Sequence, residues 1–267
     1  MQHGGSGIQR ATVARLCRFP VKGLSAEELS SVQLSPDTGV PGDRAFALAR
    51  ATTDFDEASP RPLDKGRFLQ LRNNERLATV TTRLESQVGI LLVSLNGRDI
   101  LSADLNADKG RQSVEEFFGE LVGQAGDRRP RLVRARNHKF TDAGILSREL
   151  LWAVSVINLA TVRALASSVG AVVDPLRFRA NIYIDGLPPW SELNWVGKSV
   201  RIAGVKCVGL LRTNRCGAIN VDPATGARDN SLLIGLKKNF GHLEFGVYVG
   251  ILGSGAVGVG DDIVVGD

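Results

Sequence analysis

The sequence predicts a mainly β protein with a few helices. Three observations support this prediction. Thirty glycines among 267 residues indicate many turns between short elements. Apolar and polar residues alternate in short runs such as 11–19, which is typical of strands with one buried face. Asn96-Gly97 lies between two such runs, and this dipeptide is a strong hairpin signal.

The composition is that of an ordinary globular protein, with 43% hydrophobic and 23% charged residues. This is enough material for one large domain or two small ones. The net charge of +5 suits an anionic ligand such as a phosphate group, but it is too small and too scattered to indicate nucleic-acid binding.

Cysteine use and the lack of targeting signals indicate a cytoplasmic protein. The three cysteines cannot all pair, and no CxxC motif is present, so we expect a reducing compartment and no disulfide scaffold. The first residues lack the pattern of a signal peptide. The most apolar long window, 150–173, contains polar residues and is not expected to span a membrane.

In the N-terminal half, alternation predicts most of the elements. The expected strands are 11–19, 28–34, 45–49, 77–82, 88–95 and 99–102. The polar run 51–66, rich in Asp and Pro, predicts a mobile loop. Ser113 and Glu116 have the spacing of a capping box, so we expect a helix over 113–122 that ends at Gly123.

A basic segment follows the predicted helix. Its cations are Arg128, Arg129, Arg131, Arg134, Arg136 and Lys139. Such a run is either a strip that faces a phosphate or a solvated connector between two modules, and charge runs of this kind favour the connector.

The C-terminal half continues with further strands and one helix. We expect a strand over 150–157, then a helix over 159–169 that Asn158 caps and Gly170 ends. A strand over 176–184 would place Arg177, Arg179 and Asn181 on one face. The segment 229–241 is polar, and the remaining strands are 199–202, 205–211, 247–252 and 262–265. The GxGxxG match at 253–258 has no helix after it, so we interpret it as a glycine-rich turn.

Cys216 is the strongest candidate for chemistry. It follows Arg215 directly and Arg212 by four residues, and nearby positive charge favours a thiolate. A thiolate is either a nucleophile or a ligand for a soft metal. Turn residues at 222–226 place Cys216 near the start of a strand that enters a hairpin. The alternatives are an inert half-buried thiol and a Cys–His dyad.

The other cysteines and histidines predict no second site. Cys17 and Cys207 lie in apolar runs and are expected in the core. The three histidines are scattered without the spacing of zinc ligands.

Cations in both halves of the chain complete the predicted site. Lys22 and Arg44 lie at strand ends in the N-terminal half, and Arg177, Arg179 and Arg215 accompany Cys216 in the other half. Each alone is typical of a surface residue. Together, a thiolate and several guanidinium groups predict a ligand that carries both a soft metal and a phosphate.

The order of motifs resembles that of the MOSC family, found at the C-terminus of molybdenum-cofactor sulfurases and in mitochondrial amidoxime-reducing components. The matching stretches are 19–23, 42–44, 178–181, 189–190, 214–216, 221–226 and 260–261. The resemblance implies a MOSC β-barrel over 131–266 packed against an N-terminal β-barrel module over 11–130.

By this resemblance Cys216, with Arg215, is the catalytic group and either binds molybdenum or carries a persulfide. Lys22, Arg44 and Arg179 match positions that hold the pterin or its phosphate, Ser155 matches a hydroxyl near the cofactor, and Asn181 supports the site. Arg177, Asn214 and Arg215 complete the expected cofactor-binding set. The sequence departs from the family pattern at Gly23, where serine is frequent, and at Thr213, where cysteine is frequent.

The function implied is that of a molybdenum-cofactor-binding oxidoreductase component, with Mo-molybdopterin as the cofactor. It would reduce N-hydroxylated compounds with electrons from a partner reductase or iron–sulfur protein. The first alternative is a persulfide carrier that receives its sulfur from a cysteine desulfurase. The desulfurase is the reason why the family is associated with pyridoxal phosphate. The second is a non-catalytic carrier of the cofactor. Neither nucleic acid nor a membrane is expected as a partner.

Overall fold

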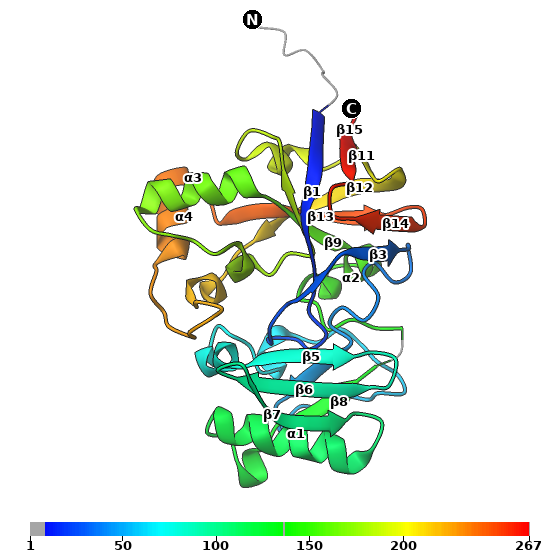
Figure 1. Cartoon of the computed structure of the whole chain (residues 1–267), viewed down its shortest axis with the longest axis vertical. Helices are drawn as coiled ribbons and strands as arrows, with labels where there is room; N and C mark the ends of the chain where they lie inside the picture. The colour runs from blue at the N-terminus through cyan, green and yellow to red at the C-terminus, as the bar shows by residue number, and fades with distance from the viewer. Residues whose placement is uncertain (1–8, 136, 267) are drawn as a thin grey trace, which may run out of the picture.

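A closed barrel of seven strands forms the part of the protein that is uppermost in Figure 1. The computed structural model describes residues 9–135 and 137–266 and confirms the mainly β fold with a few helices. The strands follow the order β10-β9-β13-β12-β11-β15-β1, and pairing between β1 and β10 closes the ring. Their bounds are β1 Gln9–Arg18, β9 Val154–Asn158, β10 Ile182–Asp185, β11 Ser199–Ile202, β12 Val205–Asn214, β13 Glu244–Ile251 and β15 Asp262–Val265.

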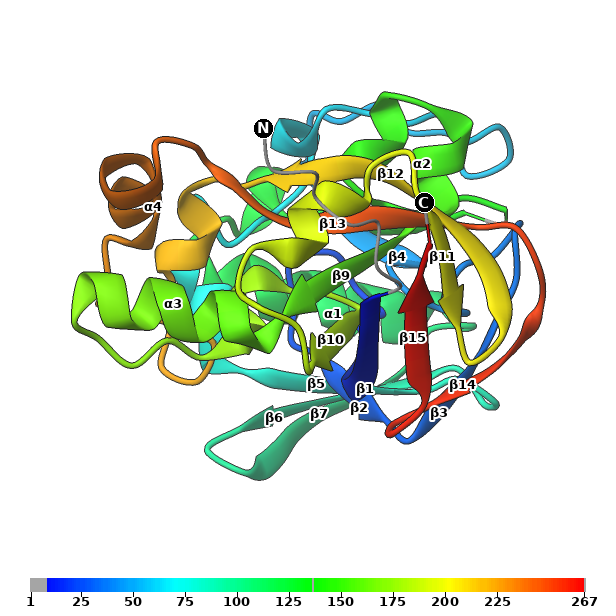
Figure 2. The same ribbon diagram turned by 90° about the horizontal axis from the view of Figure 1, so that it is seen from above.

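Aliphatic side chains fill the barrel interior, and two helices cover part of its outer face. Val13, Val156 and Val249 are among the buried residues of the interior. The helices α3 (Leu159–Val169) and α4 (Leu232–Phe240) pack against one side of the barrel (Figure 2). β9 is therefore buried at every position.

The N-terminal half has its own core and forms the lower part of Figure 1. Leu48, Leu91 and Phe118 are fully buried in this core. It lies among an antiparallel sheet β5-β6-β7, a strand pair β4–β8 and the helix α1. The bounds are β4 Phe46–Ala49, β5 Thr81–Glu85, β6 Ile90–Leu95, β7 Arg98–Asp104, α1 Asp108–Leu121 and β8 Arg131–Arg134.

The two halves exchange strands in space. β1 belongs to the barrel although it begins the chain, and β8 pairs with β4 although it follows residue 130. β2 (Glu27–Leu29) extends β1, and β3 (Ser31–Leu34) pairs with β14 (Gly255–Gly258). Because strands cross between the two halves, the structure does not test a domain boundary between residues 130 and 131, and this boundary stays a prediction.

Local signals were most accurate where a specific residue fixes the backbone. The Asn158 side chain accepts a hydrogen bond from the Ala160 N–H at 3.0 Å, and Gly170 ends α3 in the left-handed region, both as expected. Asn96 and Gly97 join β6 to β7 with φ of 51° and 75°, as a type I′ hairpin requires.

Several expected elements were wrong in the N-terminal half. The helix predicted over 113–122 begins at Asp108, and the Ser113 hydroxyl bonds back to the Lys109 carbonyl inside it. The strand expected over 77–82 begins at Thr81, after the 3₁₀ turn η2 (Glu75–Thr79). Apolar periodicity cannot separate a short buried turn from a strand.

Several expected elements in the C-terminal half were also wrong. The stretch expected as one strand over 150–157 begins as the short helix α2 (Arg148–Trp152), which Ser147 caps. Residues expected as strand over 176–184 begin as the 3₁₀ turn η5 (Pro175–Phe178). The polar segment 229–241 contains α4, and the glycine-rich stretch 253–258 contains β14.

Among the described residues, no helix is both long and apolar enough to cross a membrane.

A buried carboxylate ties the 3₁₀ turn η6 (Ser191–Trp195) to the start of α3. Glu192 accepts hydrogen bonds from the Thr161 hydroxyl at 2.9 Å and from the Asn158 N–H at 3.4 Å. Its side chain is fully buried, and this burial raises its pKa to about 7 against the opposing effect of these bonds.

A bulge in β13 shapes the edge of the barrel. Between the pairs Arg212–Val247 and Asn214–Glu244, two residues of β13 lie opposite one residue of β12. One of them is Gly246, with φ of 83°. A Cβ at this position would lie 2.6 Å from the Val156 carbonyl oxygen. The positive φ and this steric clash both require glycine at the bulge.

The first prediction concerns Glu192. Between about pH 4.5 and 7 the folded protein keeps a proton that the unfolded chain has lost, so the free energy of unfolding should fall as pH rises through this window. The contribution of Glu192 is at most about 3 kcal/mol. Urea denaturation of Glu192→Gln at the two ends of the window should show a smaller decline than the wild type. An equal decline would contradict the assignment.

The second prediction concerns Gly246. Gly246→Ala should lower the free energy of unfolding by about 2–4 kcal/mol, because a strained φ and a steric clash add. Gly204→Ala is the matched control, since Gly204 has a φ of 81° and open space around its Cβ position. The free energy of unfolding of the control should fall by only about 1–2 kcal/mol, because its positive φ is the only source of strain. Equal losses in denaturant melts would show that the clash at Gly246 is relieved.

Candidate functional site

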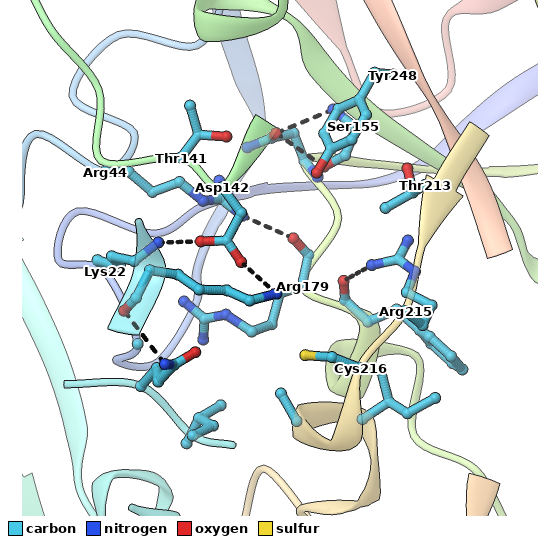
Figure 3. Close-up of a pocket in the computed structure, with 18 of the residues that line it drawn as sticks. Lys22, Arg44, Thr141, Asp142, Ser155, Arg179, Thr213, Arg215, Cys216 and Tyr248 are labelled. Carbon is cyan, nitrogen blue, oxygen red and sulfur yellow. Dashed lines mark hydrogen bonds and ion pairs between the residues drawn. The ribbon is translucent and has the colours of Figure 1, made fainter. Parts of the chain in front are cut away.

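A cavity lies where the barrel meets the N-terminal half, and every sequence-predicted site residue lines it (Figure 3). Its volume is about 190 Å³. The predicted residues that meet here are Lys22, Arg44, Ser155, Arg177, Arg179, Asn181, Asn214, Arg215 and Cys216. They come from segments up to 194 positions apart in the chain, so the fold alone brings them together.

Cys216 is the one thiol on the cavity wall. It follows the end of β12 at Asn214 and precedes the 3₁₀ turn η7 (Gly217–Asn220), so it does not begin a strand as expected. It is partly buried, and Figure 3 shows its sulfur turned toward the cavity. Cys17 and Cys207 are buried in the core, as predicted, and burial raises the pKa of both thiols to about 12.

Arg215 is fixed beside Cys216 by backbone carbonyls. Its Nε and Nη2 donate to the Phe245 carbonyl oxygen at 2.8 and 2.5 Å, and its Nη1 donates to the Phe178 carbonyl oxygen at 2.8 Å. The stacked rings of Phe178 and Phe245 support it, with centroids 4.0 Å apart. No described carboxylate pairs with this guanidinium, and burial lowers the pKa of Arg215.

Arg212 does not share this environment, which corrects the expectation that two guanidinium groups flank Cys216. Its Nε donates to the Leu193 carbonyl oxygen at 2.7 Å, and its Nη1 pairs with Glu244 at 3.0 Å. It does not line the cavity. The pairing of β12 with β13 shifts register between Arg212 and Asn214. The regular alternation of side chains along a strand therefore does not place Arg212 and Arg215 on one face.

Arg44 and Arg179 share the ring of Phe19. Their guanidinium carbons lie 4.8 and 4.4 Å from its centroid. Arg44 pairs with Asp43 at 2.5 Å and donates to the Arg179 carbonyl oxygen at 2.9 Å. Burial disfavours its charge, but Asp43 more than compensates and raises the pKa of Arg44. Arg179 donates a hydrogen bond to the Leu24 carbonyl oxygen at 2.5 Å, and burial lowers its pKa.

Lys22 reaches the cavity from the segment after β1. Its ammonium donates to the Phe140 carbonyl oxygen at 3.0 Å and forms a short ion pair with Asp142. Lys65 approaches the same carboxylate at 3.7 Å from the rim. Burial opposes the charge on Asp142, but Lys22 and then Lys65 hold its pKa below the ordinary value.

Ser155, Asn181 and Arg177 are bound mainly to the protein itself. The Ser155 hydroxyl donates to Asn181 Oδ1 at 3.1 Å, and Asn181 Nδ2 donates to the Cys17 carbonyl oxygen at 3.2 Å. Arg177 pairs with Asp222 and Asp229, both at 2.7 Å. These three side chains therefore stabilise the cavity wall. Contact of each with a ligand stays a prediction. The expectation that Arg177, Arg179 and Asn181 share one face of a strand was wrong, because the 3₁₀ turn η5 takes the place of the start of that strand.

The cavity also contains residues that sequence reasoning did not assign to it. Lys139 was interpreted as part of a solvated connector, yet its side chain is only 5% exposed. Asp43 lies in the matching stretch 42–44 but had no role assigned to it. Asp142 and Tyr248 carried no signal beyond a polar residue in a strand or loop. Thr213 was identified only as a departure from the family pattern, and the fold places all three on the cavity wall. Of the other cations in that basic segment, Arg136 lies outside the described residues.

Positive charge in the cavity is not balanced by the protein. With Arg177 set aside because Asp222 and Asp229 pair with it, six cations remain against the two carboxylates Asp43 and Asp142. The six are Lys22, Arg44, Lys65, Lys139, Arg179 and Arg215. Two buried polar atoms on the wall, Lys139 Nζ and Thr213 Oγ1, have no hydrogen-bond partner among the described residues. An excess of buried and partly buried cations, together with unpaired donors, indicates an anionic ligand.

Comparisons with known proteins find two domain families that match successive parts of the chain. The MOSC N-terminal beta barrel domain family matches residues 10–130, and the MOSC domain family matches residues 149–264. Two curated proteins named molybdenum cofactor sulfurase, from Caenorhabditis elegans and Caenorhabditis briggsae, are 36% and 26% identical to this chain over 260 residues. Each alignment covers 89% of this chain and 33% of the relative, so the chain spans about a third of their length.

A solved structure of similar extent is the YUAD protein from Bacillus subtilis. It is 12% identical, with a TM-score of 0.45, and 97% of each chain is covered. A likeness at this level carries no argument about the present cavity. The two domain matches lie in tandem and together cover most of the sequence, and the chain belongs to the MOSC family.

Proposed function

We propose that this cavity binds the molybdenum cofactor and that the protein is the cofactor-binding component of an oxidoreductase. The observation that carries the proposal is the single cavity-facing thiol, Cys216, on a wall where buried and partly buried cations outnumber the carboxylates. A soft metal needs a thiolate, and a pterin phosphate needs cations and N–H donors. The names of the Caenorhabditis relatives support a role connected with this cofactor.

The donor set fits a metal that arrives as part of a cofactor. Among the described residues there is no group of three or more His, Cys, Asp or Glu side chains that could hold a bare metal ion. Cys216 would supply one sulfur, and the cofactor would supply the remaining ligands. Lys22, Arg44 and Arg179 would hold the phosphate end, because their charges converge on the same cavity.

The cofactor, when bound, supplies two-electron redox chemistry. We propose that the protein loaded with this cofactor would reduce N-hydroxylated compounds, a reaction in which an N–O bond breaks, two electrons and two protons are consumed, and an amine and water form. The electrons would come from a separate reductase or iron–sulfur protein. The protein's own residues would hold the cofactor and orient the substrate, and Tyr248 would donate a hydrogen bond from the cavity wall.

A second candidate function is sulfur transfer through Cys216. The partly buried sulfur at the cavity wall and the names of the curated relatives favour it. The Cys216 thiolate would attack the outer sulfur of a donor persulfide, form a new S–S bond and release the donor thiolate. Arg215 lies next to it in the chain and would stabilise the negative charge of the persulfide.

The test of the first function is the molybdenum content of protein made in a host that synthesises the cofactor. Cys216→Ala should lower the ratio of molybdenum to protein by at least about tenfold, because the one protein–metal bond is lost. Cys207→Ala, which removes a thiol from the core, is the matched control and should keep the wild-type ratio. Equal molybdenum contents in the wild type and Cys216→Ala would refute the proposal.

Sulfur transfer has a separate test. After incubation with a cysteine desulfurase and cysteine, intact-mass analysis should detect one added sulfur atom on the wild type and none on Cys216→Ala. Cys207→Ala should still take up the sulfur. An adduct absent from the wild type, or one that persists without Cys216, would exclude this function.

A further inference from the structure

One cavity residue has a local environment that the proposed function does not explain. The Lys139 side chain is 5% exposed, and its Nζ has no hydrogen-bond partner among the described residues. The nearest ion pair that it forms is with Asp43 Oδ2 at 3.7 Å, which is too long for a hydrogen bond. An ammonium group carries three N–H donors, and leaving them unpaired in a buried site is costly.

Asp43 does not remove this deficit, because other groups already occupy its carboxylate. Its Oδ2 pairs with Arg44 at 2.5 Å, and its Oδ1 accepts the Phe19 N–H at 2.9 Å. The Lys139–Asp43–Arg44 group therefore has two positive charges against one negative charge; Lys139 and Asp43 are buried, and Arg44 is partly buried. The second positive charge lies on the wall of a cavity that already has excess cations.

The groups that face Lys139 are few. Asp43 and Arg44 approach from the turn before β4, and the Trp152 ring of α2 lies 6.0 Å from the ammonium. The backbone of Gly39 closes one side, where even a Cβ would come within 3.1 Å of Nζ. Along the same cavity wall are Lys22 and Asp142, which pair with each other.

We propose that Lys139 is an anion-binding residue of the cavity and that it becomes fully protonated when a dianionic group binds there. The inference rests on the proposed function only in that the cavity takes an anion. It does not depend on molybdenum or on turnover. The chemistry recognised is that of a phosphate or sulfate group with two negative charges, and the unpaired N–H groups of Lys139 would donate to its oxygens.

The proton balance follows from the environment of the free protein. Burial, helped by repulsion from Arg44, lowers the pKa of Lys139 to about 8 against the attraction of Asp43. A bound dianion favours the charged form and raises that pKa. Near pH 8 about half of the free protein lacks this proton, so binding should take up about half a proton from solution. Affinity should then fall by up to about tenfold per pH unit above pH 8.

Sulfate is the probe, because it keeps both negative charges between about pH 6 and 10 and any proton uptake belongs to the protein. Isothermal titration calorimetry at pH 8 in two buffers of different ionisation enthalpy gives the number of protons taken up. The wild type should take up about half a proton per sulfate. Lys139→Met should take up less than half of the wild-type amount, and its affinity should depend more weakly on pH.

Two further variants separate the proposed role from a general loss of charge. Lys65→Met removes a lysine from the rim of the same cavity, so it should weaken sulfate binding while the proton uptake stays at the wild-type level. Lys139→Arg keeps a charge that does not titrate in this range and should bind sulfate without the wild-type uptake. Thermal melts of each variant show whether it is folded.

Proton uptake that is unchanged in a folded Lys139→Met would overturn the inference, and so would the absence of sulfate binding to the wild type at any pH. The molybdenum content of the same proteins is measured separately. Protein that contains molybdenum but shows no uptake linked to Lys139 contradicts this inference alone. Protein that shows the uptake but contains no molybdenum contradicts the proposed function alone.

Discussion

Excess positive charge at the junction of the barrel and the N-terminal half constrains the design of this structure. With Arg177 set aside because Asp222 and Asp229 pair with it, six cationic side chains meet there, and Asp43 and Asp142 are the acidic groups among the described residues of the same wall. The fold tolerates this by giving most of these cations other partners. Arg215 has three bonds to carbonyl oxygens, while Arg44 and Arg179 lie over the ring of Phe19. Carbonyl dipoles and aromatic faces stabilise a guanidinium without neutralising it, so the charge stays available to a ligand.

Irregular backbone at the strand ends delivers these side chains. The bulge at Gly246 lies beside the carbonyl that holds Arg215, and Arg179 has a left-handed φ of 54° at the end of η5. Strained backbone of this kind costs about 1–3 kcal/mol at a site and persists only where surrounding structure fixes it. Closure of the barrel provides that structure, and Arg177 adds to it by binding Asp222 and Asp229 behind the Cys216 segment.

The cavity therefore combines two kinds of chemistry that rarely coincide by chance. One is a single sulfur that faces the cavity, while both other thiols are buried in hydrocarbon. The other is an excess of cations that includes Lys139, whose Nζ has no hydrogen-bond partner among the described residues. The proposed ligand, with a soft metal at one end and a phosphate at the other, would satisfy both. Membership of the MOSC family supports the same proposal.

The sequence by itself determined the β-rich class, the capped helix after Asn158, the Asn96-Gly97 hairpin and the family, because each depends on local backbone chemistry or on an ordered set of motifs. It also identified nine of the residues that line the cavity, Cys216 among them. The partners and charge states of these residues depend on the tertiary structure. It placed Arg212 against Glu244 and buried Lys139 in the wall, although both are ordinary cations in the sequence. The physical reason is that desolvation and pairing depend on neighbours distant in the chain, which spacing cannot specify.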